Sequence, residues 1–279
     1  MAPIHPVTLG SVRKTLLLPL WGRAVEARKP RPLLIDSAAV RIIDSIAYDF
    51  STIAAHINFV TRLSWIARSL HIDRTIRQFL ARYPSATIVN LGCGLDTTFE
   101  RVDNERLRWY DLDLPDVVEL RSQYIQQRPR RHFIAASILD DAWMNGLASV
   151  DPMLFVAAGL LYYFTESDVK SVLGRLADQF PGSELIFDAC SVRGVRIANR
   201  RVIRDGGMDA DAQLKWGLGK AAEIESWDRR FTVLAEYPIF RGLKGTLSLK
   251  EKCGTLISDT LRIMSMVHLG MDLKRGNRA

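Results

Sequence analysis

Seven short runs of apolar and β-branched residues are spaced along the chain from residue 86 onward. They are Ala86–Leu91, Leu107–Leu112, His132–Ala136, Met153–Ala158, Glu184–Ala189, Phe231–Tyr237 and Thr260–His268. The first, fourth and fifth runs are apolar at nearly every position, as in Ile88-Val89. Strands buried on both faces of a parallel sheet have this pattern. The runs therefore predict a mainly parallel sheet.

Helical periodicity fills the intervals between the earlier runs. Asp116–Gln127 and Glu166–Phe180 carry apolar residues at spacings of three and four, and Thr165 stands at an N-cap position with Asp168 three residues later. Strands that alternate with helices indicate βαβ units and a doubly wound α/β sheet. The interval before the last run need not hold a full crossover helix, so we expect the final strand to run antiparallel.

The chain before the first strand lacks such runs and predicts three helices. These cover Asp36–Asp49, Ile57–Leu70 and Asp73–Tyr83. A segment rich in Arg and Gly, Ser191–Ser226, interrupts the later strands. We therefore expect one domain, with a helical cover at 1–84, an α/β core at 85–190 and 227–279, and an inserted lid at 191–226.

Composition indicates a folded, cytoplasmic protein. The chain has 279 residues, 48% of them hydrophobic, and three widely spaced cysteines without metal-ligand spacing. No apolar run reaches the ~18 residues of a membrane span. Leu16–Trp21 imitates the apolar part of a signal peptide, but it contains Pro19 and lacks a cleavage site. We interpret it as an amphipathic lid or packing segment.

The net charge of +7 predicts an anionic partner. The basic residues are dispersed and lack the interleaved aromatic residues of a surface on which bases stack. We therefore expect an acidic small molecule, with no nucleic acid, membrane or metal ion bound, and a monomer or homodimer.

A glycine turn closes the first predicted strand. Gly92-Cys93-Gly94 follows Leu91, and Thr97–Val102 can then begin a helix. At this crossover of an open α/β sheet, glycines let a ligand approach the backbone. A dinucleotide-binding turn has a third glycine and rests a pyrophosphate on the helix N-terminus. Here Asp96 stands in that place and would repel a pyrophosphate. The turn therefore favours S-adenosylmethionine, which has no phosphate, over NAD.

Two carboxylates end the second predicted strand. Asp111 and Asp113 follow the glycines by about twenty positions, where a carboxylate accepts hydrogen bonds from the ribose hydroxyls. They share a face by strand alternation, so spacing does not choose between them. By the same logic Ser137–Asp140 would lie beside the adenine, and Ala157–Phe164 beneath the reacting methyl.

Leu91–Thr97 and Tyr110–Pro115 resemble the leucine carboxyl methyltransferase family, in particular a bacterial branch that includes polyketide carboxyl O-methyltransferases. The resemblance extends over nearly the whole chain. It includes Thr15–Leu20, Trp143-Met144, Val156–Phe164 and Lys215–Leu218. It implies a class I, Rossmann-like methyltransferase fold, with a seven-stranded sheet whose last strand is antiparallel, and S-adenosylmethionine as methyl donor.

The resemblance also assigns residues to the cofactor. Arg68 fits the place of an arginine that pairs with the methionine carboxylate in related enzymes, a contact that a guanidinium makes in bidentate geometry. Asp113 would hold the ribose, and Ser137 and Ile138 the adenine. The expected cofactor set is Arg68, Gly92, Cys93, Gly94, Asp113, Leu114, Ser137, Ile138 and Ala158. Ala158 stands where the eukaryotic branch has a glutamate, so the leucine carboxyl substrate of that branch is not expected.

The expected reaction is O-methylation of a small-molecule carboxylate. A carboxylate is already ionised at neutral pH, so positioning, worth roughly 7–11 kcal/mol, can replace a general base. A phenol, with a pKa near 10, would need a base. Tyr163 and His268 are the candidate catalytic side chains. His56, His71 and His132 have the positions of packing or surface residues.

A set of arginines in the insertion has two interpretations. Its members are Arg193, Arg196, Arg200, Arg201 and Arg204, four of which would share one helical face. They form either a solvated face or a funnel for an acidic substrate. Two other function classes stay open: a nucleic-acid-associated methyltransferase and a non-catalytic protein that binds S-adenosylmethionine.

Overall fold

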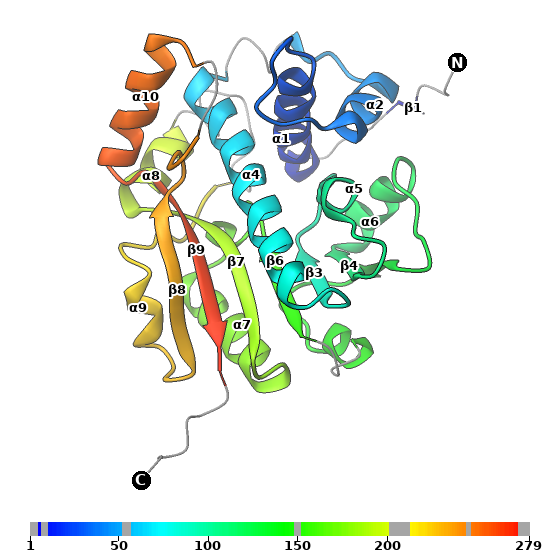
Figure 1. Ribbon diagram of the computed structural model, residues 1–279, viewed down its shortest axis with the longest axis vertical. Helices are drawn as coiled ribbons and strands as arrows, with labels where there is room; N and C mark the ends of the chain where they lie inside the picture. The colour runs from blue at the N-terminus through cyan, green and yellow to red at the C-terminus, as the bar shows by residue number, and fades with distance from the viewer. Residues whose placement is uncertain are drawn as a thin grey trace.

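A seven-stranded sheet forms the centre of the computed structural model, which describes residues 5–6, 11–51, 57–147, 152–200, 213–243 and 247–272. The strand order is β5-β4-β3-β6-β7-β9-β8. The strands are β3 Thr87–Leu91, β4 Arg108–Asp113, β5 Arg131–Ala135, β6 Met153–Ala157, β7 Ser183–Cys190, β8 Phe231–Pro238 and β9 Met264–Met271. β9 runs antiparallel to both of its neighbours, β7 and β8, and its arrow points opposite to that of β8 in Figure 1. The predicted sheet and its antiparallel last strand are confirmed.

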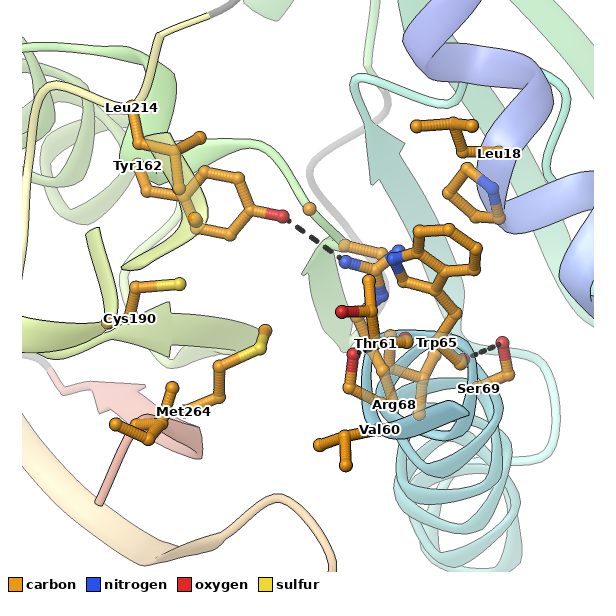
Figure 2. Close-up of a pocket in the computed structure, with 18 of the residues that line it drawn as sticks. Leu18, Val60, Thr61, Trp65, Arg68, Ser69, Tyr162, Cys190, Leu214 and Met264 are labelled. Atoms are coloured by element: carbon orange, nitrogen blue, oxygen red, sulfur yellow. Dashed lines mark hydrogen bonds between the residues drawn. The ribbon is translucent and has the colours of Figure 1, made fainter. Parts of the chain in front are cut away.

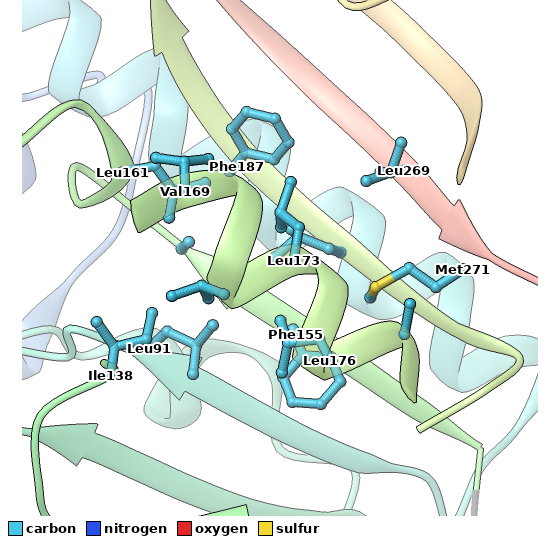
Figure 3. Packing of buried hydrophobic residues seen from close by; sticks show 14 of the residues in the cluster. Leu91, Ile138, Phe155, Leu161, Val169, Leu173, Leu176, Phe187, Leu269 and Met271 are labelled. Carbon is cyan, nitrogen blue, oxygen red and sulfur yellow. The ribbon is translucent and has the colours of Figure 1, made fainter. Parts of the chain in front are cut away.

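Side chains of the central strands alternate between two helical layers. Val89, Phe155 and Phe187 pack against α7 (Glu166–Gln179) on one face, as Figure 3 shows for part of this cluster. The intervening side chains pack against α4 (Phe59–Arg82) on the other face. Both faces of these strands are therefore covered, which explains their continuous apolar runs.

Shorter helices connect and cover this core (Figure 1). They are α1 Ser11–Ala27, α2 Ser37–Ser45, α5 Thr98–Val102, α6 Pro115–Ser122, α8 Val192–Ala198, α9 Ala222–Glu225 and α10 Leu249–Thr260, with 3₁₀ turns η1 Ala142–Gly146 and η2 Leu161–Tyr163. The two-residue strands β1 His5–Pro6 and β2 Ile46–Ala47 pair with each other. The segment Leu16–Trp21 belongs to α1, whose apolar side chains pack on α2 and on Trp65 of α4.

Two predicted helices form one continuous helix in the structure. The sequence predicts one helix at Ile57–Leu70 and a second that begins at Asp73. Instead, Asp73 lies inside α4, and its carboxylate accepts hydrogen bonds from Nε and Nη2 of Arg101 at 2.8 and 2.9 Å. Since Arg101 takes up this carboxylate, Asp73 caps no helix and α4 continues to Arg82.

The predicted position of the last strand was wrong by several residues. Helix α10 lies in the interval that, by the sequence, need not hold a full crossover helix. It ends at Thr260, so β9 begins only at Met264. A capping box of Ser248 and Glu251 starts α10. The predicted helices at Asp36–Asp49 and Asp116–Gln127 are also shorter than expected, because α2 ends at Ser45 and α6 at Ser122.

Candidate functional site

The turn after β3 has a backbone conformation that requires its glycines. Gly92 and Gly94 have φ angles of +63° and +46°, in the left-handed region that favours glycine. A Cβ on Gly92 would lie 2.5 Å from Cδ1 of Leu160, and one on Gly94 would lie 2.9 Å from Cδ2 of Leu16. The turn is thus contacted from two sides, by Leu160 of the segment after β6 and by Leu16 of α1.

The structure distinguishes the two carboxylates that spacing could not. Asp111 is fully buried, and its Oδ2 accepts hydrogen bonds from Arg121 Nη2 and Arg131 Nε, both at 2.8 Å. Because Asp111 is enclosed by these arginines, it is not available to a ligand. Arg121 also donates from Nη1 to the carbonyl of Gly94 at 2.7 Å. This buried network therefore supports the glycine turn from below.

Asp113 lies at the edge of the same turn and is half-buried. Its Oδ2 accepts the backbone N–H of Gly94 at 2.7 Å and its Oδ1 accepts that of Leu114 at 2.8 Å. Burial raises the pKa of the Asp113 carboxyl, and these two hydrogen bonds oppose the shift. Of the two candidates, Asp113 is the carboxylate whose position suits a ribose.

The residues expected at the adenine follow β5, next to Asp113. Asp113 pairs with Ala135 in the sheet, and Ser137 and Ile138 come directly after that strand. Ile138 is buried in the core, whereas Leu114 is 45% exposed. These residues and Asp113 share one edge of the sheet but do not line the cavity described next.

A cavity of about 540 Å³ opens beside the glycine turn. Arg68, Gly92, Cys93, Gly94, Ala158 and Tyr163 line it, so the structure brings these predicted residues together. Figure 2 shows its two walls: α4 carries Trp65 and Arg68 on one side, and Cys190, Leu214 and Met264 lie on the other.

Arg68 is held in this cavity by residues of the opposite wall. Its Nη1 donates to Asp188 Oδ2 at 3.0 Å and to the Tyr162 hydroxyl at 3.3 Å (Figure 2 shows the second contact). Burial disfavours the charge of Arg68, but Asp188 and Tyr162 together more than offset this and raise the pKa of the guanidinium. Arg68 therefore stays charged inside the cavity.

Sequence reasoning missed Asp188 and Tyr162. Asp188 is an acid that directly follows the apolar residues Leu185–Phe187 of a predicted strand, a position where a buried charge needs a partner. That signal was available in the sequence. The partner was not, since Arg68 lies 120 residues earlier in the chain.

Charged residues tie α1 and α2 to the segment after the glycine turn. Arg23 of α1 donates to Asp36 Oδ2 at 2.9 Å and to the carbonyl of Leu95 at 3.3 Å. Burial alone would raise the pKa of Asp96, but Arg23, Arg101 and hydrogen bonds from Thr98 lower it to about 2. Asp96 is therefore a carboxylate at the start of α5, as the sequence predicts.

The part of the cavity away from the glycine turn is apolar. Its lining includes Ile197 of α8, Leu214, and Ile257 of α10. Burial raises the pKa of Tyr163 to about 12 and that of Cys190 to about 12. Burial likewise raises the pKa of Tyr162 well above its usual value. These groups are protonated at neutral pH, so they donate hydrogen bonds but do not act as bases.

His268 does not lie at the cavity. It pairs with Ile186 in the middle of β9, and its Nε2 is 2.7 Å from Glu184 Oε2. Because β9 begins later than predicted and runs antiparallel, Met264 instead occupies the cavity edge. His268 is therefore corrected from a catalytic candidate to a partner of Glu184.

The other histidines lie outside this cavity or outside the described residues. His71 is buried on α4, with Nε2 2.9 Å from the carbonyl oxygen of Ile239. His132 is exposed on β5, and His56 lies outside the described residues. Of the arginine set, Arg193, Arg196 and Arg200 are exposed on or beside α8. Arg201 and Arg204 lie outside the described residues.

These residues fit an adenosyl cofactor. The glycine turn lines the cavity, a half-buried carboxylate stands at the edge of the turn, and a charged guanidinium lies in the same cavity. Within the described segments, no group of three or more His, Cys, Asp or Glu residues could hold a metal ion. No helix in those segments is long and apolar enough to cross a membrane.

Comparison with known proteins points to one family. The leucine carboxyl methyltransferase profile matches residues 17–177. The chain is 35% identical over 222 residues to the tetracenomycin polyketide synthesis O-methyltransferase of Streptomyces glaucescens, covering 79% of this chain and 80% of the relative. It is 33% identical over 259 residues to the S-adenosyl-L-methionine-dependent methyltransferase dpfgK of Gibberella zeae, covering 83% and 85%.

Solved structures agree on the fold. A DUF574 family protein of Streptomyces avermitilis superposes with a TM-score of 0.60 at 14% identity, covering 93% of this chain and 97% of that one. The CurJ carbon methyltransferase superposes with a TM-score of 0.53 at 13% identity, covering 94% and 68%. With the glycine turn and Arg68 in place, these matches show that the chain belongs to the leucine carboxyl methyltransferase family and is an S-adenosylmethionine-dependent methyltransferase.

Proposed function

We propose that this enzyme methylates the carboxylate of a small, largely apolar acid and releases a methyl ester. The observation that carries the proposal is the lack of a base among the described residues around the apolar part of the cavity. Tyr162, Tyr163 and Cys190 all have raised pKa values there. A carboxylate needs no deprotonation at neutral pH, whereas a phenol does.

The assignment of residues to the cofactor is part of this proposal. Arg68 takes the methionine carboxylate, Asp113 the ribose, and Ser137 and Ile138 the adenine. Leu114 borders the ribose, and Gly92, Cys93, Gly94 and Ala158 bring the backbone close. When bound, the cofactor supplies a methyl group on a positively charged sulfur. Arg68, already paired with Asp188, adds little further positive charge beside that sulfur.

Binding of the acceptor depends on apolar contact. Leu214 and Met264 offer their side chains to the body of the acid, and Tyr163 can donate its hydroxyl to one carboxylate oxygen. Orientation of the ionised oxygen toward the methyl carbon then supplies most of the acceleration.

We further propose that 1–84 and 191–226 cover this site within one domain. The S. glaucescens relative, named for polyketide synthesis, makes aromatic polyketide acids the first acceptors to test.

An assay of matched acceptors tests the proposal. Aromatic acids are compared with analogues in which a phenol or a primary amide replaces the carboxyl group, and products are identified by mass spectrometry. The expected product forms from the acids and reverts to them in mild alkali, because esters hydrolyse and aryl ethers do not. An alkali-stable product from the phenols would contradict carboxyl methylation while leaving the methyltransferase assignment intact.

A further inference from the structure

Asp188 is a fully buried carboxylate at the end of β7, beside the strand that leads to the reacting site. Its Oδ1 accepts the backbone N–H of Gly159 at 2.6 Å, and its Oδ2 accepts Nη1 of Arg68 at 3.0 Å. One carboxylate thus joins α4 to the turn after β6. Both contacts are made to residues that line the cavity.

Gly159 shows how closely the guanidinium is held. It has a φ of +72°, and a Cβ there would lie 2.6 Å from Nη1 of Arg68 and 3.1 Å from the hydroxyl of Tyr162. The guanidinium therefore rests against the Gly159 backbone. Asp188 fixes both partners of this contact.

Only one of the three guanidinium nitrogens is used by these partners. Nη1 donates to both Asp188 and Tyr162, while Nε and Nη2 make no hydrogen bond within the part of the chain that the structure describes. A free arginine side chain loses rotamer entropy when a ligand orders it. An arginine already fixed through one nitrogen avoids most of this loss, which favours binding.

We infer that Asp188 is a positioning residue that holds Arg68 so that its unused N–H groups face the methionine carboxylate of the cofactor. This inference rests on the proposed role of Arg68. If Asp188 only stabilised the cavity, its loss would weaken the binding of every ligand there. If it positions Arg68, its loss weakens only the binding that depends on the amino-acid end of the cofactor.

Two ligands separate these roles. S-adenosylhomocysteine has the amino-acid end, and 5′-methylthioadenosine lacks it but keeps the nucleoside. Calorimetry gives both affinities for the wild type, Asp188→Asn, Arg68→Gln and the double variant. Asp188→Asn should weaken S-adenosylhomocysteine binding at least tenfold and change methylthioadenosine binding by less than about twofold. The double variant should bind no more weakly than Arg68→Gln, because Asp188 acts through Arg68.

The chain offers a matched control. Glu184 lies on the same strand and accepts hydrogen bonds from Arg82 of the same helix at 2.9 and 3.0 Å, away from the cavity. Glu184→Gln should leave both affinities unchanged. Asp188→Glu keeps the charge, so its ratio of S-adenosylhomocysteine affinity to methylthioadenosine affinity should lie between the ratios of the wild type and of Asp188→Asn. This variant provides the test if Asp188→Asn does not fold.

Equal losses for the two ligands, or additive losses in the double variant, would overturn the positioning role. Failure of the proposed function gives a different result. In that case Arg68→Gln leaves S-adenosylhomocysteine affinity unchanged, or the wild type binds neither nucleoside.

Discussion

The two parts of the cavity are built in different ways. Around the glycine turn, the contacts are main-chain hydrogen bonds and buried ion pairs, such as Gly94 to Asp113 and Arg68 to Asp188. On the acceptor side, the lining consists of apolar side chains such as Ile197, Leu214 and Ile257 from three separate segments. Hydrogen bonds specify a ligand by geometry, whereas apolar walls specify it by size and shape. In the proposed assignment, hydrogen bonds therefore specify the methyl donor, and size and shape specify the acid.

Among changes on the proposed cofactor side, removal of the Asp113 carboxylate should weaken cofactor binding the most. Asp113→Ala loses two charge-assisted hydrogen bonds to the ribose, each worth ~1.5–3 kcal/mol, so S-adenosylhomocysteine affinity should fall about a hundredfold or more. Isothermal titration calorimetry measures this, with the exposed Glu119→Ala on α6 as the control. An affinity within a factor of about two of the wild type would show that another group holds the ribose.

A methyl group at Gly159 should be the next most damaging change. Gly159→Ala combines a left-handed φ, which costs about 1–2 kcal/mol for other residues, with contact to the Arg68 guanidinium. S-adenosylhomocysteine affinity should fall roughly tenfold to a hundredfold, while methylthioadenosine affinity changes far less. Gly182→Ala is the matched control, because its φ is +85° but nothing lies within 4 Å of the added Cβ. If both variants behave alike, backbone strain and not Arg68 explains the loss.

Acid should destabilise the cofactor side through Asp96. Its pKa in the folded protein is about 2, below the value of the unfolded chain, so its stabilisation is complete above pH ~4 and is lost as the pH falls toward 2. A shift of this size corresponds to about 2 kcal/mol. Asp96→Asn should therefore lower the free energy of unfolding by roughly that amount at pH 7 and flatten its dependence between pH ~4 and 2. Urea unfolding across this range provides the test, and an unchanged slope would argue against the Arg23 and Arg101 contacts.

The smallest effect is expected from charge near the acceptor side. Neutralising Arg196 and Arg200 with glutamine should raise KM for an acidic substrate about two- to fivefold at low salt and leave cofactor affinity unchanged, since exposed charges act only at long range. The difference should vanish near 1 M salt, where the Debye length is ~3 Å. Arg106→Gln, exposed after α5, removes the same charge elsewhere. A salt-independent rise in KM would indicate direct contact with the substrate.

The sequence predicted the parts of the site that depend on local chain geometry. Gly92, Gly94 and the strand ends follow from short patterns, because a tight turn requires particular residues whatever surrounds it. Strand spacing alone could not choose Asp113 over Asp111, and only the family resemblance did, because the physical difference is that Arg121 and Arg131 bind Asp111 in the folded chain.

The misplaced elements share a physical cause. A helix was predicted to begin at Asp73, and His268 was placed at the end of the last strand, from local sequence patterns alone. In each case a distant partner decided the outcome: Arg101 binds Asp73, and β7 sets the register of β9. The apolar acceptor wall was equally hidden, because Leu214 and Met264 meet only in the folded chain.

The separate origins of the two walls affect how this enzyme can evolve or be redesigned. Helices α8 and α10 carry much of the acceptor wall, and their described residues make no hydrogen bond to the glycine turn. In the proposed assignment, substitutions at Ile197, Ile257 or Leu261 therefore change the shape of the acceptor wall and leave the ion pairs on the donor side in place. A library confined to those positions can shift acceptor preference while methyl-donor use stays intact, which makes the scaffold suited to diversification in steps.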